Sequence, residues 1–356
     1  MIPPGGTIGI LGGGQLGRML AQAAQSLGYR VHVFCPDQGA PATQVTDSVT
    51  LAEYSDEAAL ARFADAVDVV TFEFENVPAR AAAILAAQRP VHPRPAILEI
   101  CQDRLREKDF LKSIGVATTP YRAVDSLDTL RAAMKAIGPN AILKTARSGY
   151  DGKGQIALDG KSDFDAAWRE IGGVASILEA RVDFTMEISV IVARAADGAE
   201  TAYVPVENRH ANHILDTTIA PAPIDAKLAA RADRVARTVA AKLELIGLVA
   251  VEMFVAKSGE ILVNELAPRP HNSGHWTIDA CVTSQFEQLV RAVCGLPLGS
   301  AERHSNAVMK NLIGADVAKW RAALDAPDAK LHLYGKTSAP PGRKMGHVTT
   351  LSPRKG

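Results

Sequence analysis

One stretch of the sequence decides the fold: Val249-Ala-Val-Glu252-Met-Phe-Val-Ala-Lys257-Ser-Gly259-Glu-Ile-Leu-Val-Asn264-Glu265-Leu-Ala-Pro-Arg269-Pro-His271-Asn272-Ser-Gly-His275-Trp276. Two apolar runs flank a short polar turn at 257–259, which is the pattern of a β-hairpin. Such a turn places Glu252 opposite Asn264 or Glu265, and the Cβ atoms of facing residues lie roughly 5 Å apart. The hairpin therefore predicts two carboxylates side by side in otherwise apolar strands.

Two carboxylates this close need a compensating charge. Like charges about 4 Å apart repel by roughly 4 kcal/mol when the effective dielectric constant is near 20. A strand end in solvent or a basic side chain would relieve the repulsion, and so would a cation such as Mg²⁺, which is usually held by one or two carboxylates and by substrate phosphates. The following residues, 267–276, favour the metal interpretation. Two prolines exclude regular structure there, so we expect a polar, cationic loop at the end of a buried strand, where binding residues tend to lie.

The composition indicates a neutral chain with a large core. Its 356 residues suggest two or three domains, 47% of them are hydrophobic, and 39 Lys and Arg balance 39 Asp and Glu. Such a chain lacks the charge footprint of a nucleic-acid-binding or membrane-surface protein. No stretch has the length of a membrane helix, and the first residues lack the features of a signal peptide. The four cysteines are scattered without a C-x-x-C spacing, which favours a reducing, cytoplasmic location.

The first hundred residues follow the pattern of a doubly wound α/β domain. A buried strand at Thr7–Leu11 leads into Gly12-Gly-Gly-Gln15-Leu16-Gly17 and a helix, and the next strand ends near Asp37. This spacing is the fingerprint of dinucleotide-binding domains. The helix N-terminus could bind the pyrophosphate of NAD(P) or the phosphate of another ligand, or the glycines could serve only tight packing. Glu73 and Glu75 follow a later strand, at the edge where such sheets bind ligands.

A second glycine-rich loop lies between two short strands, with Lys144 at the end of the first. Its sequence, Gly149-Tyr-Asp-Gly-Lys-Gly-Gln155, has three glycines within six residues, so backbone N–H groups can approach a phosphate closely. Lys144 and Lys153 add positive charge. The loop is not a P-loop, because G-x-x-x-x-G-K-[ST] is absent. A phosphate-binding hairpin is favoured over an ordinary mobile hairpin with solvated lysines.

Other basic residues are weaker candidates. Arg104 falls in the first turn of a helix over 103–114, where a solvated arginine is the commoner case. His210 and His213 lie in an antiparallel meander, and the loop 334–344 carries three cations that suit a phosphate monoester. We also expect a strand over 202–206, a capping box at 284–287 and a helix over 317–324.

These motifs together resemble the ATP-grasp ligases, and more closely the 5-(carboxyamino)imidazole ribonucleotide synthase family of purine biosynthesis. The resemblance covers essentially the whole chain. Its most specific part is the run His271-Asn-Ser-Gly-His-Trp276, whereas the first domain and the glycine loop are shared more widely. The motifs that carry it are Gly12-Gly-Gly-Gln-Leu-Gly-Arg-Met19, Thr71-Phe-Glu-Phe-Glu-Asn-Val77, Asn264-Glu-Leu-Ala-Pro-Arg-Pro-His271 with the run that follows, and Pro341-Gly-Arg-Lys-Met-Gly-His347.

The resemblance implies an α/β protein with the ATP-grasp fold. It implies a Rossmann-like pre-ATP-grasp domain over residues 1–100, an ATP-grasp domain over 101–296 with a lid subdomain over about 117–180, and a small β-rich C-terminal domain over 297–356. It also implies a homodimer and a reaction. ATP would phosphorylate bicarbonate to carboxyphosphate, and the amine of 5-aminoimidazole ribonucleotide would then take the carboxyl group, releasing ADP and phosphate. Such phosphoryl transfer needs charge neutralisation and positioning rather than a protein nucleophile.

The same resemblance implies site residues, position by position. Asn264 and Glu265 point to opposite faces of an ideal strand, so a bulge or a strand end must let both reach the site. Expected at ATP are Arg104, Lys144, Gly149, Tyr150, Asp151, Gly152, Lys153, Gly154, Gln155, the hinge Glu179, Ala180, Arg181 and Val182, Glu187 at the ribose, His210, Asn264 and Glu265. Expected at Mg²⁺ are Glu252 and Glu265. Arg269, His271 and Asn272 would position bicarbonate and the amine, and Gln15, Leu16, Glu75, Lys336, Arg343 and Lys344 would hold the ribonucleotide.

Three alternatives stay open from the sequence. Another ATP-grasp ligase, such as one acting on glycinamide ribonucleotide, would differ only in the amine that it uses. An NAD(P)-linked oxidoreductase would use the first glycine motif and Asp37, but it would leave Glu252, Glu265 and the second glycine loop without a role. A non-catalytic module would bind ATP without turnover. The chain has no biotin acceptor motif (Ala-Met-Lys-Met), so a biotin-borne carboxyl group is not expected.

Overall fold

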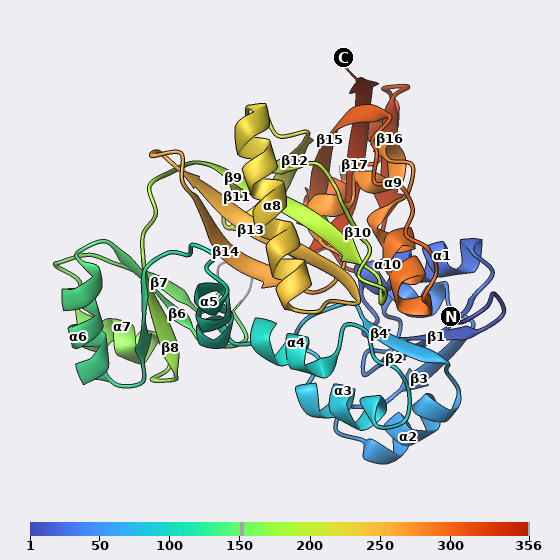
Figure 1. Ribbon diagram of the computed structural model, residues 1–356, viewed down its shortest axis with the longest axis horizontal. Coiled ribbons are helices and arrows are strands. Elements are labelled where there is room, and N and C mark those ends of the chain that lie inside the picture. The colour runs from blue at the N-terminus through green and yellow to red at the C-terminus, as the bar shows by residue number, and fades with distance from the viewer. Residues whose placement is uncertain (150–152, 355–356) are drawn as a thin grey trace.

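A computed structural model describes residues 1–149 and 153–354 of the chain (Figure 1). Tyr150, Asp151 and Gly152, which we predict in the ATP loop, lie outside the described residues. In the part of the chain that the structure describes, no helix combines the length and the apolar character needed to cross a membrane.

The first part of the chain forms the doubly wound unit that its sequence predicts. Its sheet is parallel, with the order β3-β2-β1-β4. Apolar cores lie on both faces of this sheet, because helices pack on both sides. The elements are β1 (Thr7–Leu11), α1 (Gln15–Ser26), β2 (Arg30–Cys35), η1 (Pro41–Gln44), β3 (Ser48–Leu51), α2 (Glu57–Asp65), β4 (Val69–Phe72), α3 (Ala79–Ala86) and α4 (Pro95–Cys101).

A small antiparallel sheet stands to one side of the molecule (Figure 1). Its strand order is β5-β8-β6-β7, and it has a core of its own, with Leu130, Leu143 and Leu178 fully buried. The helix α5 (Arg104–Ser113) lies between this unit and the rest of the molecule. The elements are β5 (Tyr121–Val124), α6 (Leu127–Ile137), β6 (Ala141–Thr145), β7 (Gln155–Leu158), α7 (Phe164–Glu170) and β8 (Ser176–Ala180).

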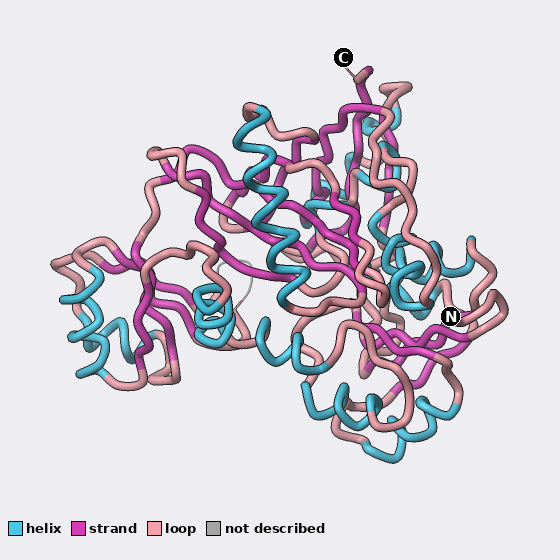
Figure 2. Tube along the Cα trace, viewed as in Figure 1, coloured by secondary structure: helices cyan, strands magenta, loops and turns pink. Residues whose placement is uncertain are grey.

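The largest sheet runs without interruption from the hairpin to the C-terminal strands (Figures 1 and 2). Its order is β14-β13-β9-β11-β12-β15-β17-β16, and β10 also pairs with β9. The helix α8 packs on one face and α10 on the other. Its elements are β9 (Phe184–Arg194), β10 (Glu200–Ala202), β11 (Val206–Ala211), β12 (Ile214–Ala220), α8 (Ala226–Lys242), β13 (Gly247–Ala256), β14 (Ile261–Ala267), η2 (Asn272–Gly274), α9 (Thr277–Ala280), α10 (Gln285–Cys294), β15 (Ser305–Ile313), β16 (Ala329–Leu333) and β17 (Lys344–Pro353).

Three local predictions were wrong in detail. The helix expected over 317–324 is instead two 3₁₀ turns, η3 (Gly314–Lys319) and η4 (Ala322–Leu324), whose Trp320 and Leu324 are exposed. Without a buried apolar face, so short a helix is not stable. The strand expected over 202–206 is split between β10 and β11 at Pro205, which has no N–H to donate. Of the capping box, only the Ser284 half forms, because Glu287 pairs with Arg291 instead.

Candidate active site

A cavity of about 840 Å³ is lined by strand residues of the small and the largest sheet and by first-domain residues of α1 and of the segment after β4. It brings together candidates that are more than 250 positions apart in the sequence, from Gln15 to Lys344. They include Lys144 and Lys153 at the second glycine loop, Lys344 of the C-terminal loop, and both carboxylates of the hairpin. The predicted residues that line it are Gln15, Leu16, Glu75, Arg104, Lys144, Gly149, Lys153, Gly154, Gln155, Glu187, His210, Glu252, Asn264, Glu265, Arg269, His271, Asn272 and Lys344; the alternative histidine, His213, lines it too.

Among the described residues, six predicted ones do not line this cavity. Glu179 is buried beneath it, where its carboxylate accepts a hydrogen bond of 2.7 Å from Lys144. Ala180 ends β8, and Arg181 and Val182 follow it. In the C-terminal loop, the Lys336 ammonium donates to the carbonyl oxygen of Lys344 at 2.6 Å, while the exposed Arg343 donates to the Ser338 hydroxyl at 2.9 Å.

The hairpin pairs the two carboxylates as its sequence predicts. Glu252 stands opposite Glu265, and Met253 stands opposite Val263, so Asn264 is an extra residue in β14. This β-bulge is the irregularity that lets both Asn264 and Glu265 reach the cavity. The side-chain oxygen Oδ1 of Asn264 is buried and accepts no hydrogen bond from the described residues. The bulge thus presents one amide oxygen and two carboxylates together.

One face of α5 holds the bulge in place. The Lys108 ammonium donates to the carbonyl oxygens of Val263 and Asn264, at 3.2 and 2.8 Å. Glu107 accepts from the N–H of Leu266 at 2.9 Å, and Arg104 contacts the Glu265 carboxylate at 3.2 Å. Since β14 is the edge strand of its sheet, these contacts supply partners to backbone groups that have no neighbouring strand. Burial raises the pKa of Glu107 to about 8.

Buried charges beneath the cavity form a compact network. Glu179 lies between Lys144, at 2.7 Å, and Lys108, at 3.7 Å. Burial by itself would raise the pKa of Glu179, but the two ammonium groups and the hydrogen bond from Lys144 lower it to about 2. The positive charge of Lys144 is therefore held at the cavity wall by a fixed counter-ion.

A second ion pair joins the first domain to the loop after β14. The Arg269 guanidinium donates to the Glu75 carboxylate, and the two side chains are largely buried. Burial would raise the pKa of Glu75, yet the charge of Arg269 and its hydrogen bond lower it to about 2. Arg269 is thus fixed by an acid that comes from the end of β4.

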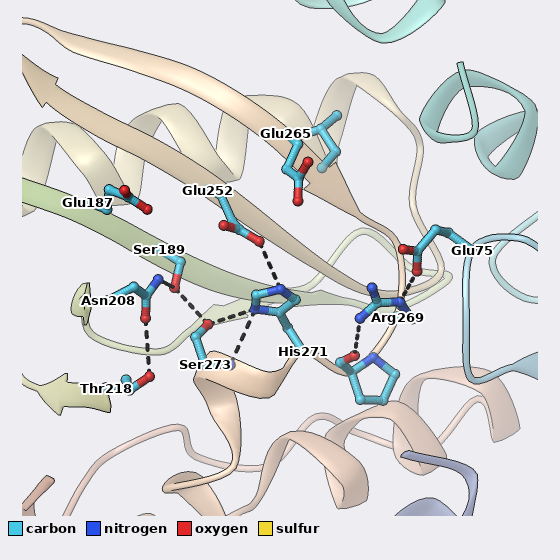
Figure 3. A network of polar contacts seen from close by, with 12 residues as sticks. Glu75, Glu187, Ser189, Asn208, Thr218, Glu252, Glu265, Arg269, His271 and Ser273 are labelled. Carbon is cyan, nitrogen blue, oxygen red and sulfur yellow. Dashed lines mark hydrogen bonds and ion pairs between the residues drawn. The ribbon is translucent and has the colours of Figure 1, made fainter. Parts of the chain in front are cut away.

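His271 lies against Glu252, with its Nε2 at 2.8 Å from the carboxylate (Figure 3). Although Glu252 is deeply buried, its contacts with His271 and the positive charges of His210 and Arg269 lower its pKa to about 2. Elsewhere on the cavity wall, His210 pairs with Glu187 at 2.8 Å. Burial lowers the pKa of His210, but the contact with Glu187 raises it by more, so the net shift of this pKa is upward.

The first glycine motif is occupied by an acid of the chain itself. The carboxylate of Glu73 accepts hydrogen bonds from the backbone N–H groups of Gly14 and Gly17, at 2.8 and 3.1 Å. A Cβ atom on Gly12 or Gly14 would lie within 2.6 Å of the Glu73 side chain, which explains the glycines. Because the N-terminus of α1 already binds an anion, a dinucleotide pyrophosphate would have to displace Glu73. This argues against the NAD(P) alternative.

Asp279, His332 and His347 also lie close together, with their ligand atoms within 4.8 Å of one another. The rings of His332 and His347, however, stack with centroids 4.5 Å apart and planes only 17° apart. A metal ion lies close to the plane of each imidazole that binds it, so these rings do not aim at one point. Their hydrogen bonds to Asp279 and to the Tyr334 hydroxyl, at 2.9 and 2.8 Å, indicate a structural cluster.

Three family models match consecutive parts of the chain. The ribonucleotide synthetase preATP-grasp domain matches residues 6–102, the ATP-grasp domain matches 109–286, and the phosphoribosylaminoimidazole carboxylase C-terminal domain matches 307–356. A Brucella melitensis protein named N5-carboxyaminoimidazole ribonucleotide synthase is 50% identical over 99% of this chain and 98% of its own length. The chain belongs to the N5-carboxyaminoimidazole ribonucleotide synthase family. The predicted ATP-grasp fold is thereby confirmed.

Other relatives of this synthase family extend the comparison. The bifunctional purine synthesis protein purC/E of Dictyostelium discoideum is 47% identical over 98% of this chain, which spans only 37% of that protein's length. A solved ADP complex of purK, N5-carboxyaminoimidazole ribonucleotide synthetase, has a TM-score of 0.96 at 43% identity, covering 99% of this chain and 94% of its own. The Aspergillus clavatus N5-carboxyaminoimidazole synthase, in complex with ADP and 5-aminoimidazole ribonucleotide, has a TM-score of 0.91 at 30% identity, covering 98% and 94%.

The roles of several residues in or around the cavity were not predicted, although the resemblance to the synthase family was recognised. Lys108 and Glu107 had one available signal, since charged residues at 104, 107 and 108 share a helix face with the buried Leu111. Glu73 was noted as an acid directly after a buried strand, but its contact with the first glycine motif was not predicted. Nothing local marks Ser189 or Asn208, and Ser273 lies in the specific run 271–276 without an expected role. Their side chains meet only when η2 packs against the paired strands β9 and β11.

Proposed function

We propose that this protein carboxylates the amine of 5-aminoimidazole ribonucleotide, using ATP and bicarbonate. Bicarbonate attacks the γ-phosphorus of ATP, which gives carboxyphosphate and ADP. The amine then attacks the carboxyl carbon, phosphate leaves, and 5-(carboxyamino)imidazole ribonucleotide forms, as in de novo purine biosynthesis. The observation that carries this proposal is the single cavity that joins a lysine and a glycine loop, a carboxylate pair and an Arg–His pair to residues of the first domain. Family membership supports it, because the named relatives are synthases of this product.

The ATP end of the cavity would be formed by the small sheet and the hairpin. In this proposal Lys144, Arg104 and the loop 149–155 hold the phosphates, and Glu187 and His210 lie at the ribose. The hinge 179–182 carries the adenine from the edge of β8. Glu179 holds the Lys144 ammonium group in place at the cavity. This supports the assignment, because a positioned cation binds phosphate groups well.

Mg²⁺ fits the oxygen atoms that the bulge presents. Glu252 and Glu265 supply carboxylates, and Asn264 supplies a buried amide oxygen that accepts no hydrogen bond from the described residues. Hard cations prefer such all-oxygen sets. When bound, the ion would neutralise the phosphate charge that builds up during transfer.

The other end of the cavity would bind the carboxyl group and the ribonucleotide. Arg269, His271 and Asn272 would position bicarbonate and the amine, and both polar atoms of the Asn272 amide are buried without a hydrogen bond from the described residues. Such an unsatisfied amide supports a ligand contact. Gln15, Leu16 and Glu75 would line the ribonucleotide site, and Lys336, Arg343 and Lys344 would lie near its phosphate.

We also propose the domain limits 1–100, 101–296 and 297–356, with a lid over about 117–180. The three family-model matches support the three domain limits. The separate core of the small sheet supports the lid. A homodimer is proposed as well, and exposed apolar side chains on C-terminal elements, namely Val308, Trp320, Leu324 and Leu333, favour a partner surface there. The four free cysteines are consistent with the proposed cytoplasmic location.

A phosphate-release assay tests this function. We expect release to require ATP, Mg²⁺ and bicarbonate, and to rise strongly when 5-aminoimidazole ribonucleotide is added. Glycinamide ribonucleotide in its place should give no stimulation, which separates the proposal from a sister ligase. Phosphate release that is indifferent to bicarbonate, or ATP binding without any release, would refute it.

A further inference from the structure

A chain of buried hydrogen bonds runs from β12 to His271 (Figure 3). It passes from Thr218 to the amide of Asn208 at 3.2 Å, on to Ser189 at 2.9 Å, to Ser273 at 2.7 Å, and to His271 Nδ1 at 2.8 Å. The four residues before His271 are at most 5% exposed, so bulk water does not compete for these bonds. Side chains from four separate segments therefore form one series of hydrogen bonds that ends at a single ring nitrogen.

A backbone contact shows the direction of these hydrogen bonds at the histidine end. The N–H of Ser273 donates to Nδ1 of His271 at 3.3 Å. A backbone N–H can only donate, so the nitrogen that accepts it carries no hydrogen. The ring hydrogen must then lie on Nε2, which is 2.8 Å from the Glu252 carboxylate. His271 is thus a neutral imidazole that donates through Nε2.

Each earlier bond follows from this one. The Ser273 hydroxyl must donate to Nδ1, so its oxygen accepts from the Ser189 hydroxyl. Ser189 in turn accepts from the Asn208 NH₂ group, and the Asn208 carbonyl oxygen accepts from the Thr218 hydroxyl. All hydrogens in the chain point the same way, and the donor and acceptor ends of the Asn208 amide set this direction.

We infer that Asn208, Ser189 and Ser273 are positioning residues that hold His271 in the neutral Nε2–H form. This inference rests on the proposed function for the role that it gives His271. In that role the Nε2–H of His271 donates to the Glu252 carboxylate and orients this proposed ligand of Mg²⁺, and His271 does not act as a base. The proton that the amine loses on attack then passes to the departing phosphate, which balances the step.

The test reads the ring nitrogens directly. Protein labelled with ¹⁵N-histidine is examined by long-range ¹H–¹⁵N correlation at neutral pH, and the signals of His271 are assigned by their loss in His271→Gln. We expect a protonated Nε2 and an unprotonated Nδ1.

Asn208→Asp keeps the shape of the amide but offers only acceptors, so Ser189 and Ser273 must turn their hydroxyls toward the new carboxylate. We expect Nδ1 of His271 to gain a hydrogen in that variant, with kcat lowered at least about tenfold.

Matched threonine variants provide a second route if a buried aspartate prevents folding. Thr218→Val removes the donor that orients the Asn208 amide, so a second set of His271 signals with protonated Nδ1 should appear. Thr349→Val is the control, because Thr349 is equally buried in the same sheet and its hydroxyl has no partner among the described residues; it should change neither spectrum nor kcat. A hydrogen on Nδ1 in the unmodified protein, or His271 signals unchanged by both chain variants, would overturn the inference. Neither spectrum depends on substrate, so a failed phosphate-release assay would not be mistaken for this result.

Discussion

Glu265 is the side chain on which the proposed chemistry depends most. It faces Glu252 across the hairpin, accepts from Arg104 at 3.2 Å and borders the cavity. Its side chain is 40% exposed, so little packing is lost if it is shortened. The residue therefore allows function to be separated from folding.

We predict that Glu265→Ala lowers kcat for phosphate release by on the order of 10²-fold or more, the scale expected when one preorganised charge is lost at a phosphoryl-transfer site. The unfolding midpoint should hardly change. Glu260→Ala, an exposed acid in the turn of the same hairpin, should keep full turnover. Near-normal release by the Glu265 variant would exclude its proposed metal role.

Glu179 shows how the site contributes to the pH dependence of stability. Its pKa is about 2 in the folded protein, against an ordinary value of 4.5, because Lys144 and Lys108 surround it. A lowered carboxyl pKa stabilises the folded state above the unfolded value, and this contribution is lost as the pH falls through the folded value. The relevant window is therefore about pH 4.5 down to about pH 2.

Replacing this carboxylate tests that window. Glu179→Gln leaves two buried ammonium groups without their counter-ion, so we expect a loss of roughly 3–5 kcal/mol in the free energy of unfolding at neutral pH. The difference in unfolding free energy from the unmodified protein should narrow as the pH falls below about 4.5, because Glu179 is then protonated in the unfolded state and this favours unfolding of the unmodified protein. Urea unfolding at several pH values measures it, with the exposed Glu170→Gln as control. A gap that stays constant down to about pH 3 would contradict the assignment.

The hairpin shows what sequence patterns can and cannot predict about one element. Apolar runs around a polar turn were sufficient to predict both strands and to place Glu252 opposite Asn264 or Glu265, because strand period and turn position restrict the register. The structure pairs Glu252 with Glu265. The need for a bulge followed from Asn264 and Glu265 being adjacent. The partners that hold it were not predictable, since Lys108 and Glu107 come from a helix about 155 residues earlier whose docking depends on tertiary packing.

Removing the bulge gives a prediction for the hairpin itself. The register is already regular on both sides of Asn264, so deleting this residue should leave the hairpin folded. Turnover should be lost, because the amide oxygen disappears and α5 no longer fits the strand. Asn264→Ala keeps the extra backbone unit and should retain a measurable fraction of turnover at high Mg²⁺. Circular dichroism and phosphate release separate the cases, and equal activities of the two variants would show that the bulge has no function.

The sequence predicted the architecture better than it predicted the contacts between distant parts. The first glycine motif was recognised as a strand–helix turn, but its occupant, Glu73, depends on β4 lying beside β1. In the same way, the C-terminal strands were expected as a small separate unit, whereas β15 pairs with β12 and extends the largest sheet. That continuity connects the C-terminal loop rigidly to the strands that carry the hairpin.

The loop before β17 supplies the last prediction. Arg343 is exposed and contacts Ser338, and Lys344, next to it, lines the cavity. If this loop grips the ribonucleotide phosphate, Arg343→Ala removes a charged hydrogen bond worth about 1.5–3 kcal/mol, so KM for 5-aminoimidazole ribonucleotide should rise about 10- to 100-fold. Because the loop holds a part of the substrate that does not react, kcat at saturation and KM for ATP should stay close to normal. Arg354→Ala, which removes contacts with the Glu302 carboxylate at 2.9 Å and the Arg303 carbonyl oxygen at 3.3 Å, is the matched arginine control. An unchanged ribonucleotide KM in steady-state assays would remove Arg343 from the site.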